Sequence, residues 1–92
     1  MSRKEKLIID VRTREEFVQD HIEGALNIPV HDLEFFLDFL QNKQIFVYCN
    51  SGVRANLAKK RLAKDHVNVE LLDGDWFADY PRIRRSIISA VN

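Results

Sequence analysis

An apolar run at positions 45–48 stops abruptly at Cys49, and a short polar loop follows before a helical pattern begins. The run shows no polar alternation, which is typical of a parallel strand that is covered on both faces. The loop contains Gly52, and small and apolar residues then recur at helical spacing from Ala55 to about Lys64. The sequence therefore predicts a buried strand that passes directly into a helix, with a cysteine at the junction.

Short apolar runs and helical patterns alternate along the rest of the chain. The expected strands cover residues 7–11, 26–28 and 67–72, and the expected helices cover about 14–20, 32–41 and the stretch after Pro81. This alternation indicates an α/β fold, a small open parallel sheet flanked by helices on both faces. The 92 residues suffice for one compact domain, residues 1–92, and are too few for two.

The expected helices rest on specific signals. Thr13 and Glu16 have the spacing of a capping box, in which each side chain satisfies a free backbone N–H at the start of a helix. The second helix has an apolar stripe at i, i+3, i+4 and i+7, which we expect to face the core: Leu33, Phe36, Leu37 and Leu40. The helix after Pro81 rests on a similar stripe: Ile83, Ile87 and Val91.

The composition excludes several classes of protein. Fourteen basic residues balance fourteen acidic ones, so net charge does not suggest a nucleic-acid or membrane-surface partner. A single cysteine excludes an internal disulfide and fits a reducing compartment. The apolar stretch at residues 7–9 is too short for a signal peptide, and no run approaches membrane-spanning length. We expect a soluble cytoplasmic protein, and a monomer, because no apolar helix face is left unclaimed.

Cys49 is the candidate nucleophile. The start of a helix presents unpaired N–H groups with partial positive charge, which favour the reactive thiolate form of a cysteine placed there. The alternative, a buried structural cysteine, does not explain its place before a glycine loop. The three histidines make no metal-binding spacing with one another or with Cys49, so we expect no metal and no cofactor: His21, His31 and His66. We interpret His21 as a structural turn residue.

Two segments carry a resemblance to a known family. Residues 7–29 read LIIDVRTREEFVQDHIEGALNIP, and residues 49–55 read CNSGVRA. The first resembles the N-terminal motif and the second the active-site loop of single-domain rhodaneses, the thiosulfate-type sulfurtransferases. Residues 72–76 are weakly similar to a third family segment. The chain lacks the leading strand and helix of many members, so the resemblance implies a rhodanese-like fold trimmed at the N-terminus.

The resemblance implies sulfur transfer through a persulfide. The Cys49 thiolate would take the outer sulfur of a donor such as thiosulfate and pass it to a thiophilic acceptor, which is cyanide, a thiol or a protein. Arg54 would supply positive charge for a small anionic donor. Asp10 and Arg12 would brace the loop from the neighbouring strand end. The persulfide would be held by the loop, so the candidate substrate-binding residues are Asn50, Ser51, Gly52, Val53, Arg54 and Ala55.

Several alternatives stay open. The run 51–53 is similar to members that prefer mercaptopyruvate, and Ser51 stands where some thiosulfate-preferring members have lysine. A sulfur-carrier module that relays persulfide sulfur to a partner protein is the second reading. A cysteine phosphatase is the third, but its loop has five residues between cysteine and arginine, whereas four separate Cys49 from Arg54 here. Trp76 is expected in the core or in a pocket wall, and residues 59–61 on a solvated helix face.

Overall fold

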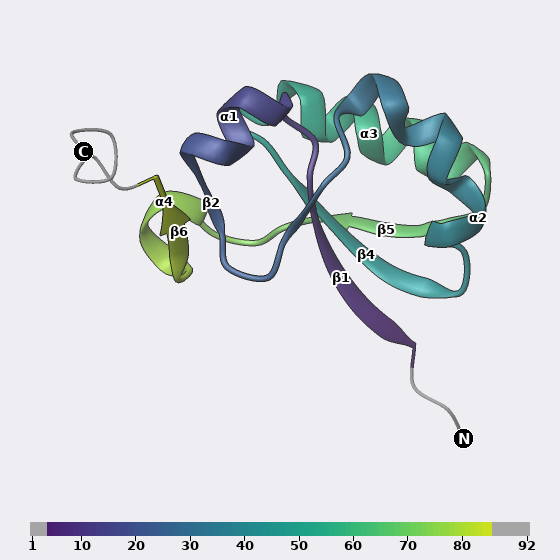
Figure 1. Cartoon of the computed structure of the whole chain (residues 1–92). Helices are drawn as coiled ribbons and strands as arrows, with labels where there is room; N and C mark the ends of the chain where they lie inside the picture. Colours follow the sequence, from purple (N-terminus) through teal and green to yellow (C-terminus); the bar gives the residue numbers. More distant parts are fainter. Residues whose placement is uncertain (1–3, 86–92) are drawn as a thin grey trace.

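The computed structural model describes residues 4–85, and its main sheet consists of parallel strands (Figure 1). In spatial order these strands are β3 (Leu26–Asn27), β1 (Glu5–Asp10), β4 (Lys43–Tyr48) and β5 (Asn68–Leu71). β4 pairs with both β1 and β5, so the strand that leads to Cys49 is central, as its apolar run predicts. Ile45 and Val47 on this strand are fully buried.

One face of the sheet carries the larger apolar cluster. The 3₁₀ helix η1 (Val30–Phe36), α2 (Leu37–Leu40) and α3 (Val53–Lys64) lie on this side (Figure 1). Leu33, Leu40 and Leu62 from these helices are fully buried against the sheet. Burying a side chain of this size stabilises the fold by about 1.5–3 kcal/mol, so this layer holds α3 firmly behind Cys49.

The opposite face carries shorter elements and a smaller cluster. They are α1 (Arg14–Gln19), β2 (Asp20–Ile22), α4 (Trp76–Asp79) and β6 (Arg82–Arg84), of which β2 and β6 form an antiparallel pair. Because side chains alternate along a strand, Tyr48 points away from Val47 and joins Ile22 and Trp76 in this second cluster. The sheet is thus flanked by helices, and the predicted α/β fold is confirmed.

The first and third expected helices are confirmed with small changes at their ends. The capping box is present: Glu16 N–H donates to Thr13 Oγ1 at 3.2 Å, and Thr13 N–H donates to Glu16 Oε1 at 3.0 Å. α1 ends at Gln19, and the next residue, Asp20, begins β2, a strand that was not predicted. α3 begins at Val53, two residues before the expected Ala55.

The helix expected over residues 32–41 is wrong in form. The segment starts as the 3₁₀ helix η1 directly after Pro29, whose carbonyl accepts the Asp32 N–H at 2.8 Å, and only then becomes the short α2. Phe36 stands at the break between them, with φ −118°, and is 40% exposed. Of the four stripe residues, Leu33 and Leu40 are therefore the ones fully buried in the core.

The helix expected after Pro81 is also wrong where the structure describes it. The residues after Pro81 form the strand β6, which pairs with β2 in antiparallel orientation, so that Asp20 lies opposite Arg84. An ion pair at 3.0 Å between Arg82 and Asp20 fixes this pairing. The other two stripe residues of the expected helix, Ile87 and Val91, lie outside the described residues.

Leu62→Ala on α3 is expected to lower the free energy of unfolding by about 2–5 kcal/mol, because it removes a fully buried side chain. Leu57 on the same helix is 53% exposed, so Leu57→Ala serves as the matched control and should change the free energy by less than about 1 kcal/mol. Urea unfolding followed by far-UV circular dichroism measures both variants. Equal losses in the two variants would contradict the buried face assigned to α3.

Candidate active site

Cys49 follows the last residue of β4 directly and is only 5% exposed. Its Sγ accepts the backbone N–H of Gly52 at 3.1 Å and that of Ala55 at 3.3 Å. Both groups belong to the turn that opens α3, where N–H groups lack carbonyl partners and carry partial positive charge. A negatively charged sulfur at this position is therefore stabilised by the backbone, which favours nucleophilic chemistry.

Gly52 sets the curvature of the loop. It is the N-cap residue of α3 and has a φ of 90°, in the left-handed region that residues with a side chain rarely adopt. A Cβ at this position would meet only Asn56 Nδ2, at 3.8 Å, so the need for glycine comes from the backbone conformation and not from crowding. This turn brings the N–H of Gly52 and the N–H of Ala55 onto the same sulfur.

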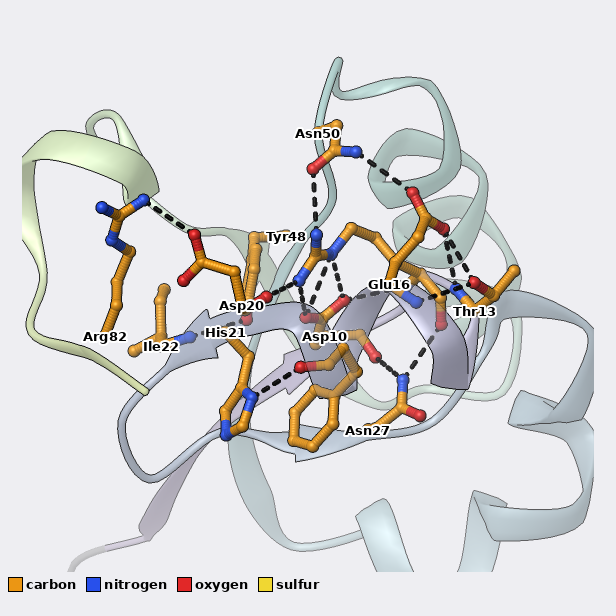
Figure 2. Close-up of polar contacts among 12 residues, drawn as sticks. Asp10, Thr13, Glu16, Asp20, His21, Ile22, Asn27, Tyr48, Asn50 and Arg82 are labelled. Carbon is orange, nitrogen blue, oxygen red and sulfur yellow. Dashed lines mark hydrogen bonds and ion pairs between the residues drawn. The ribbon is translucent and has the colours of Figure 1, made fainter. Parts of the chain in front are cut away.

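A buried ion pair lies at the carboxyl end of β1, beside the loop (Figure 2). Asp10 is fully buried and Arg12 is 3% exposed, and the Arg12 Nη2 lies 2.7 Å from Asp10 Oδ2. Arg12 Nη1 donates to Asn50 Oδ1 at 3.2 Å, and Nη2 also donates to the carbonyl of Asp20. Burial lowers the pKa of Arg12, but the hydrogen bond and charge of Asp10 outweigh it, so the pKa is raised overall. The pair thus connects β1 to both the loop and β2.

Glu16 on α1 connects the two ends of the same loop. Its Oε2 accepts from Asn50 Nδ2 at 3.1 Å and from Arg54 Nη2 at 3.0 Å, while its Oε1 accepts from Arg54 Nη1 at 2.6 Å. The hydrogen bond from Arg54 is the main cause that lowers the pKa of Glu16 to about 2, with a further contribution from Thr13 against the opposing effect of burial. Sequence reasoning assigned Glu16 only to the helix cap, because its contact with residues 50–54 depends on the fold.

A cavity of about 470 Å³ lies beside Cys49. Trp76, which is 5% exposed, forms part of its wall, as expected for a residue of the core or of a pocket wall. The Arg12 guanidinium carbon lies 4.4 Å from the centre of the Trp76 ring, so the buried arginine packs against the ring through a cation–π contact. The lining residues are Val47, Tyr48, Cys49, Asn50, Gly52, Ala55, Leu71, Leu72, Gly74, Asp75, Trp76 and Phe77.

Three of the six loop residues predicted to bind substrate line this cavity: Asn50, Gly52 and Ala55. The other three do not: Ser51, Val53 and Arg54. Arg54 was expected to face an anionic donor, but its guanidinium forms a two-point contact with Glu16, and that hydrogen bond is the main cause that raises its pKa. The substrate-binding role of the loop residues stays a prediction.

Leu71, Asp75 and Phe77 also line the cavity, although they were not predicted as neighbours of the cysteine. They lie at and after the carboxyl end of β5. Because neighbouring parallel strands end at the same edge of a sheet, their place after a predicted strand was the sequence signal that could have placed them near Cys49. Tyr48 was also missed. Burial raises the pKa of Tyr48 well above its usual range, so the hydroxyl stays protonated while it accepts the Ile22 N–H at 3.0 Å.

The histidine inside the first motif, His21, was interpreted as a structural turn residue, but it belongs to strand β2. Its environment is nevertheless structural. His21 Nδ1 lies 2.7 Å from the carbonyl oxygen of Phe17, and the two rings are stacked with centroids 3.7 Å apart (Figure 2). His21 does not line the cavity beside Cys49. Within residues 4–85, no three histidine, cysteine, aspartate or glutamate side chains gather in a way that could hold a metal ion.

Glu16→Gln is expected to destabilise the protein near neutral pH, with an effect that vanishes in acid. The folded pKa of Glu16 is lowered from 4.5 to about 2, so the ionised carboxylate stabilises the fold above about pH 4.5, and this contribution is lost as the pH falls through about 2. Urea unfolding of both proteins over this pH range measures the difference. Glu15→Gln, at an exposed neighbour, is the control. A difference for Glu16→Gln that stays constant with pH would contradict the ion pair.

Comparisons with known proteins show the family of the chain. Residues 1–80 match the family model described as a rhodanese-like domain. The chain is 36% identical over 80 residues to the thiosulfate sulfurtransferase PspE of Escherichia coli, covering 83% of this chain and 77% of that protein. It is 37% identical over 73 residues, 73% of this chain, to a candidate molybdopterin-synthase adenylyltransferase of Gracilaria tenuistipitata, but spans only 21% of that longer protein. For a relative of the same name from Porphyra purpurea, the chain spans 19% of that protein's length.

A further relative and a solved structure extend the comparison. A Bacillus subtilis protein named as a candidate sulfur carrier, YrkF, is 36% identical over 74 residues, which cover 75% of this chain and 40% of that one. The structure described as a rhodanese with anions, from Escherichia coli, superposes with a TM-score of 0.76 at 30% identity, over 87% of this chain and 99% of that one. From the family match, these relatives and the shared fold, we conclude that the chain belongs to the rhodanese-like domain family.

Proposed function

We propose that this chain is a sulfurtransferase that carries sulfane sulfur as a persulfide on Cys49. The observation that supports this most directly is the pair of backbone N–H groups on Cys49 Sγ, at 3.1 and 3.3 Å, beside an open cavity. A thiol in such a place can react as a thiolate with a ligand that enters the cavity. The relative PspE, named as a thiosulfate sulfurtransferase, supports the same reaction class.

The first step loads the enzyme. With thiosulfate, the Cys49 thiolate attacks the outer sulfur, a new S–S bond forms to Sγ, and the bond between the two donor sulfurs breaks. Its electron pair leaves with sulfite. The product is Cys49–S–S⁻, whose terminal sulfur carries the negative charge. The N–H groups between Asn50 and Ala55 would hold this charge as preorganised donors, each worth about 2.7–4 kcal/mol if it behaves as an oxyanion-hole donor does.

The second step discharges the enzyme. An acceptor thiolate or cyanide attacks the terminal sulfur, the persulfide S–S bond breaks, and Cys49 leaves as the thiolate. The acceptor becomes a persulfide or thiocyanate. Every step is a nucleophilic displacement at sulfur, so the residues of this chain perform it without a cofactor.

A sulfur carrier is the second candidate function. The relative YrkF carries that name, and the relatives from Gracilaria tenuistipitata and Porphyra purpurea are much longer proteins in which the matched region is a small part. A carrier would form the same persulfide on Cys49 but would turn over small donors and cyanide slowly. Efficient sulfur transfer to one protein thiol, with slow thiocyanate formation, distinguishes a carrier from an enzyme of small molecules.

The position of Arg54 does not fit a phosphatase. Such an enzyme needs its loop arginine directed at the phosphate, whereas Arg54 is held by Glu16 at 2.6 and 3.0 Å and does not line the cavity. The loop of four residues between Cys49 and Arg54 is also one shorter than the phosphatase loop. Cys49-dependent hydrolysis of an aryl phosphate would overturn this assignment.

The cellular setting belongs to the proposal as well. Within residues 4–85, none of the helices has the length and apolar character needed to cross a membrane. A cytoplasmic location suits a lone reactive thiol, because that compartment keeps cysteines reduced. Location, a monomeric state and a single domain over residues 1–92 stay predictions.

Incubation with thiosulfate or another sulfane-sulfur donor is expected to add the mass of one sulfur atom to the intact protein, because Cys49 becomes a persulfide. Cyanide should then remove this mass and release thiocyanate. Intact-protein mass spectrometry under non-reducing conditions measures both steps, with Cys49→Ser as the control. If no donor adds sulfur, or if Cys49→Ser gains the same mass, the proposed function is wrong.

Gly52→Ala is expected to slow persulfide formation by about tenfold or more, because strain at the left-handed residue displaces an N–H donor from Cys49 Sγ. Gly24 has nearly the same φ, +87° against +90°, and lies outside the cavity lining. Gly24→Ala therefore controls for the backbone strain of about 1–2 kcal/mol alone. The rate of sulfur loading and the free energy of unfolding are measured for both. A similar loss of loading in the two variants would show that Gly52 acts only through stability.

A further inference from the structure

The cavity beside Cys49 is large for a small inorganic donor. Thiosulfate has five non-hydrogen atoms, whereas a volume of about 470 Å³ corresponds to about 16 water molecules at ~30 Å³ each. Cavities of this size lie in the range that holds organic ligands. The space is therefore sufficient for a donor that carries a carbon chain behind its reactive sulfur.

One part of the cavity wall, formed by Leu71, Trp76 and Phe77, is apolar and partly open to solvent. Leu71 is 36% exposed and Phe77 is 49% exposed, while Trp76 is buried. The Trp76 and Phe77 rings lie with centroids 4.1 Å apart and are tilted by 31°, so the two rings pack against each other in this wall. These residues come from the end of β5 and from α4, two elements that follow each other in the chain (Figure 1). A carbon chain placed on this wall would remove exposed apolar surface from water.

The charges around the cavity do not favour a second anionic group. Among the described lining residues there is no lysine, arginine or histidine, and the one charged residue is Asp75. The arginines nearby already have carboxylate partners: Arg12 with Asp10, Arg54 with Glu16, and Arg82 with Asp20. The N–H groups of Gly52 and Ala55 point at Cys49 Sγ, where they serve the sulfur that reacts. A sulfonate or carboxylate in the cavity would therefore face the Asp75 carboxylate. The guanidinium carbons of Arg12 and Arg82 lie 4.4 Å from the Trp76 ring centre and 5.2 Å from the Phe77 ring centre, but both groups are held in ion pairs and do not line the cavity.

We propose that the donor of this enzyme is an organic persulfide whose carbon portion is neutral or cationic, and that Asp75 with the Leu71, Trp76 and Phe77 wall selects it over the thiosulfate dianion. This inference rests on the proposed function, which requires a persulfide on Cys49 but leaves the donor open. In the loading step the Cys49 thiolate attacks the terminal sulfur of R–S–S–H. The new S–S bond forms as the donor S–S bond breaks, and the leaving thiolate R–S⁻ takes the proton of the donor persulfide.

Four donors of graded charge test the selection. They are the persulfides of cysteamine, 2-mercaptoethanol and 3-mercaptopropionate, which are cationic, neutral and anionic in their carbon portions, and thiosulfate. The kcat/KM for sulfur loading of Cys49 is divided by the rate at which the same donor reacts with a small thiol in solution, which removes differences in intrinsic reactivity. The expected order is cysteamine, 2-mercaptoethanol, 3-mercaptopropionate and thiosulfate, from fastest to slowest. A normalised rate for thiosulfate above that of the neutral persulfide would overturn the proposal.

Two variants separate the effects of charge and of the apolar wall. Asn also caps helices, so Asp75→Asn keeps an oxygen for the Phe77 N–H, which Asp75 accepts at 2.9 Å, while it removes the charge. Relative to the neutral donor, the anionic donors should gain about threefold and the cationic donor should lose about as much. Phe77→Ala should slow the organic donors about fivefold relative to thiosulfate. Glu34→Gln, on η1 outside the cavity lining, is the matched control for lost negative charge and should change no ratio.

The possible outcomes test the donor assignment separately from the proposed function. Loading of Cys49 by thiosulfate as the best donor, or ratios that Asp75→Asn and Phe77→Ala leave unchanged, would overturn the donor assignment while the persulfide mechanism stands. Loading by none of the four donors would overturn the proposed function and with it this inference.

Discussion

The buried ion pair between Asp10 and Arg12 is the interaction on which the arrangement of the site depends. Removing one partner of such a pair typically costs about 3–5 kcal/mol, because the other charge stays buried without compensation. Here Arg12 also reaches Asn50 at the start of the loop, the carbonyl of Asp20 in β2 and the ring of Trp76. One side chain thus fixes the position of the loop, of the second strand pair and of the cavity wall relative to β1.

The pairing of charges decides what can stabilise the reactive sulfur. Arg12 and Arg54 each form an ion pair with a carboxylate, and the charge of Cys49 only adds to the effect of Glu16 in raising the pKa of Arg54. The groups that touch Sγ are instead the N–H groups of Gly52 and Ala55, which are neutral and held rigid by α3. Backbone donors of this kind would stabilise the negative charge of the proposed persulfide. The side chains therefore build and hold the loop, and the backbone provides the contact with sulfur.

Much of the fold could be predicted from local patterns. The uninterrupted apolar run before Cys49 predicted a central strand, and the Thr13–Glu16 capping box predicted α1, because both signals depend only on neighbouring residues. β2, β6 and the contact of Glu16 with Arg54 could not be predicted, since each depends on residues far apart in the sequence. In residues 32–41 the helical periodicity correctly predicted the burial of Leu33 and Leu40. It was wrong for Phe36, which is exposed because the segment starts as a 3₁₀ helix. For the site, the cysteine loop and the wall position of Trp76 were predicted from the sequence, whereas the places of Leu71 and Phe77 beside Cys49 were not.

The central claim is that Cys49 holds transferable sulfur, and a labelled-sulfur chase tests it most directly. The protein is loaded with a donor whose sulfane sulfur is radiolabelled, digested without reductant and separated into peptides, before and after exposure to an acceptor thiol. The account predicts that the label is found on the peptide that contains Cys49 and moves to the acceptor. Label on any other peptide, or label on Cys49 that the acceptor cannot remove, would contradict it.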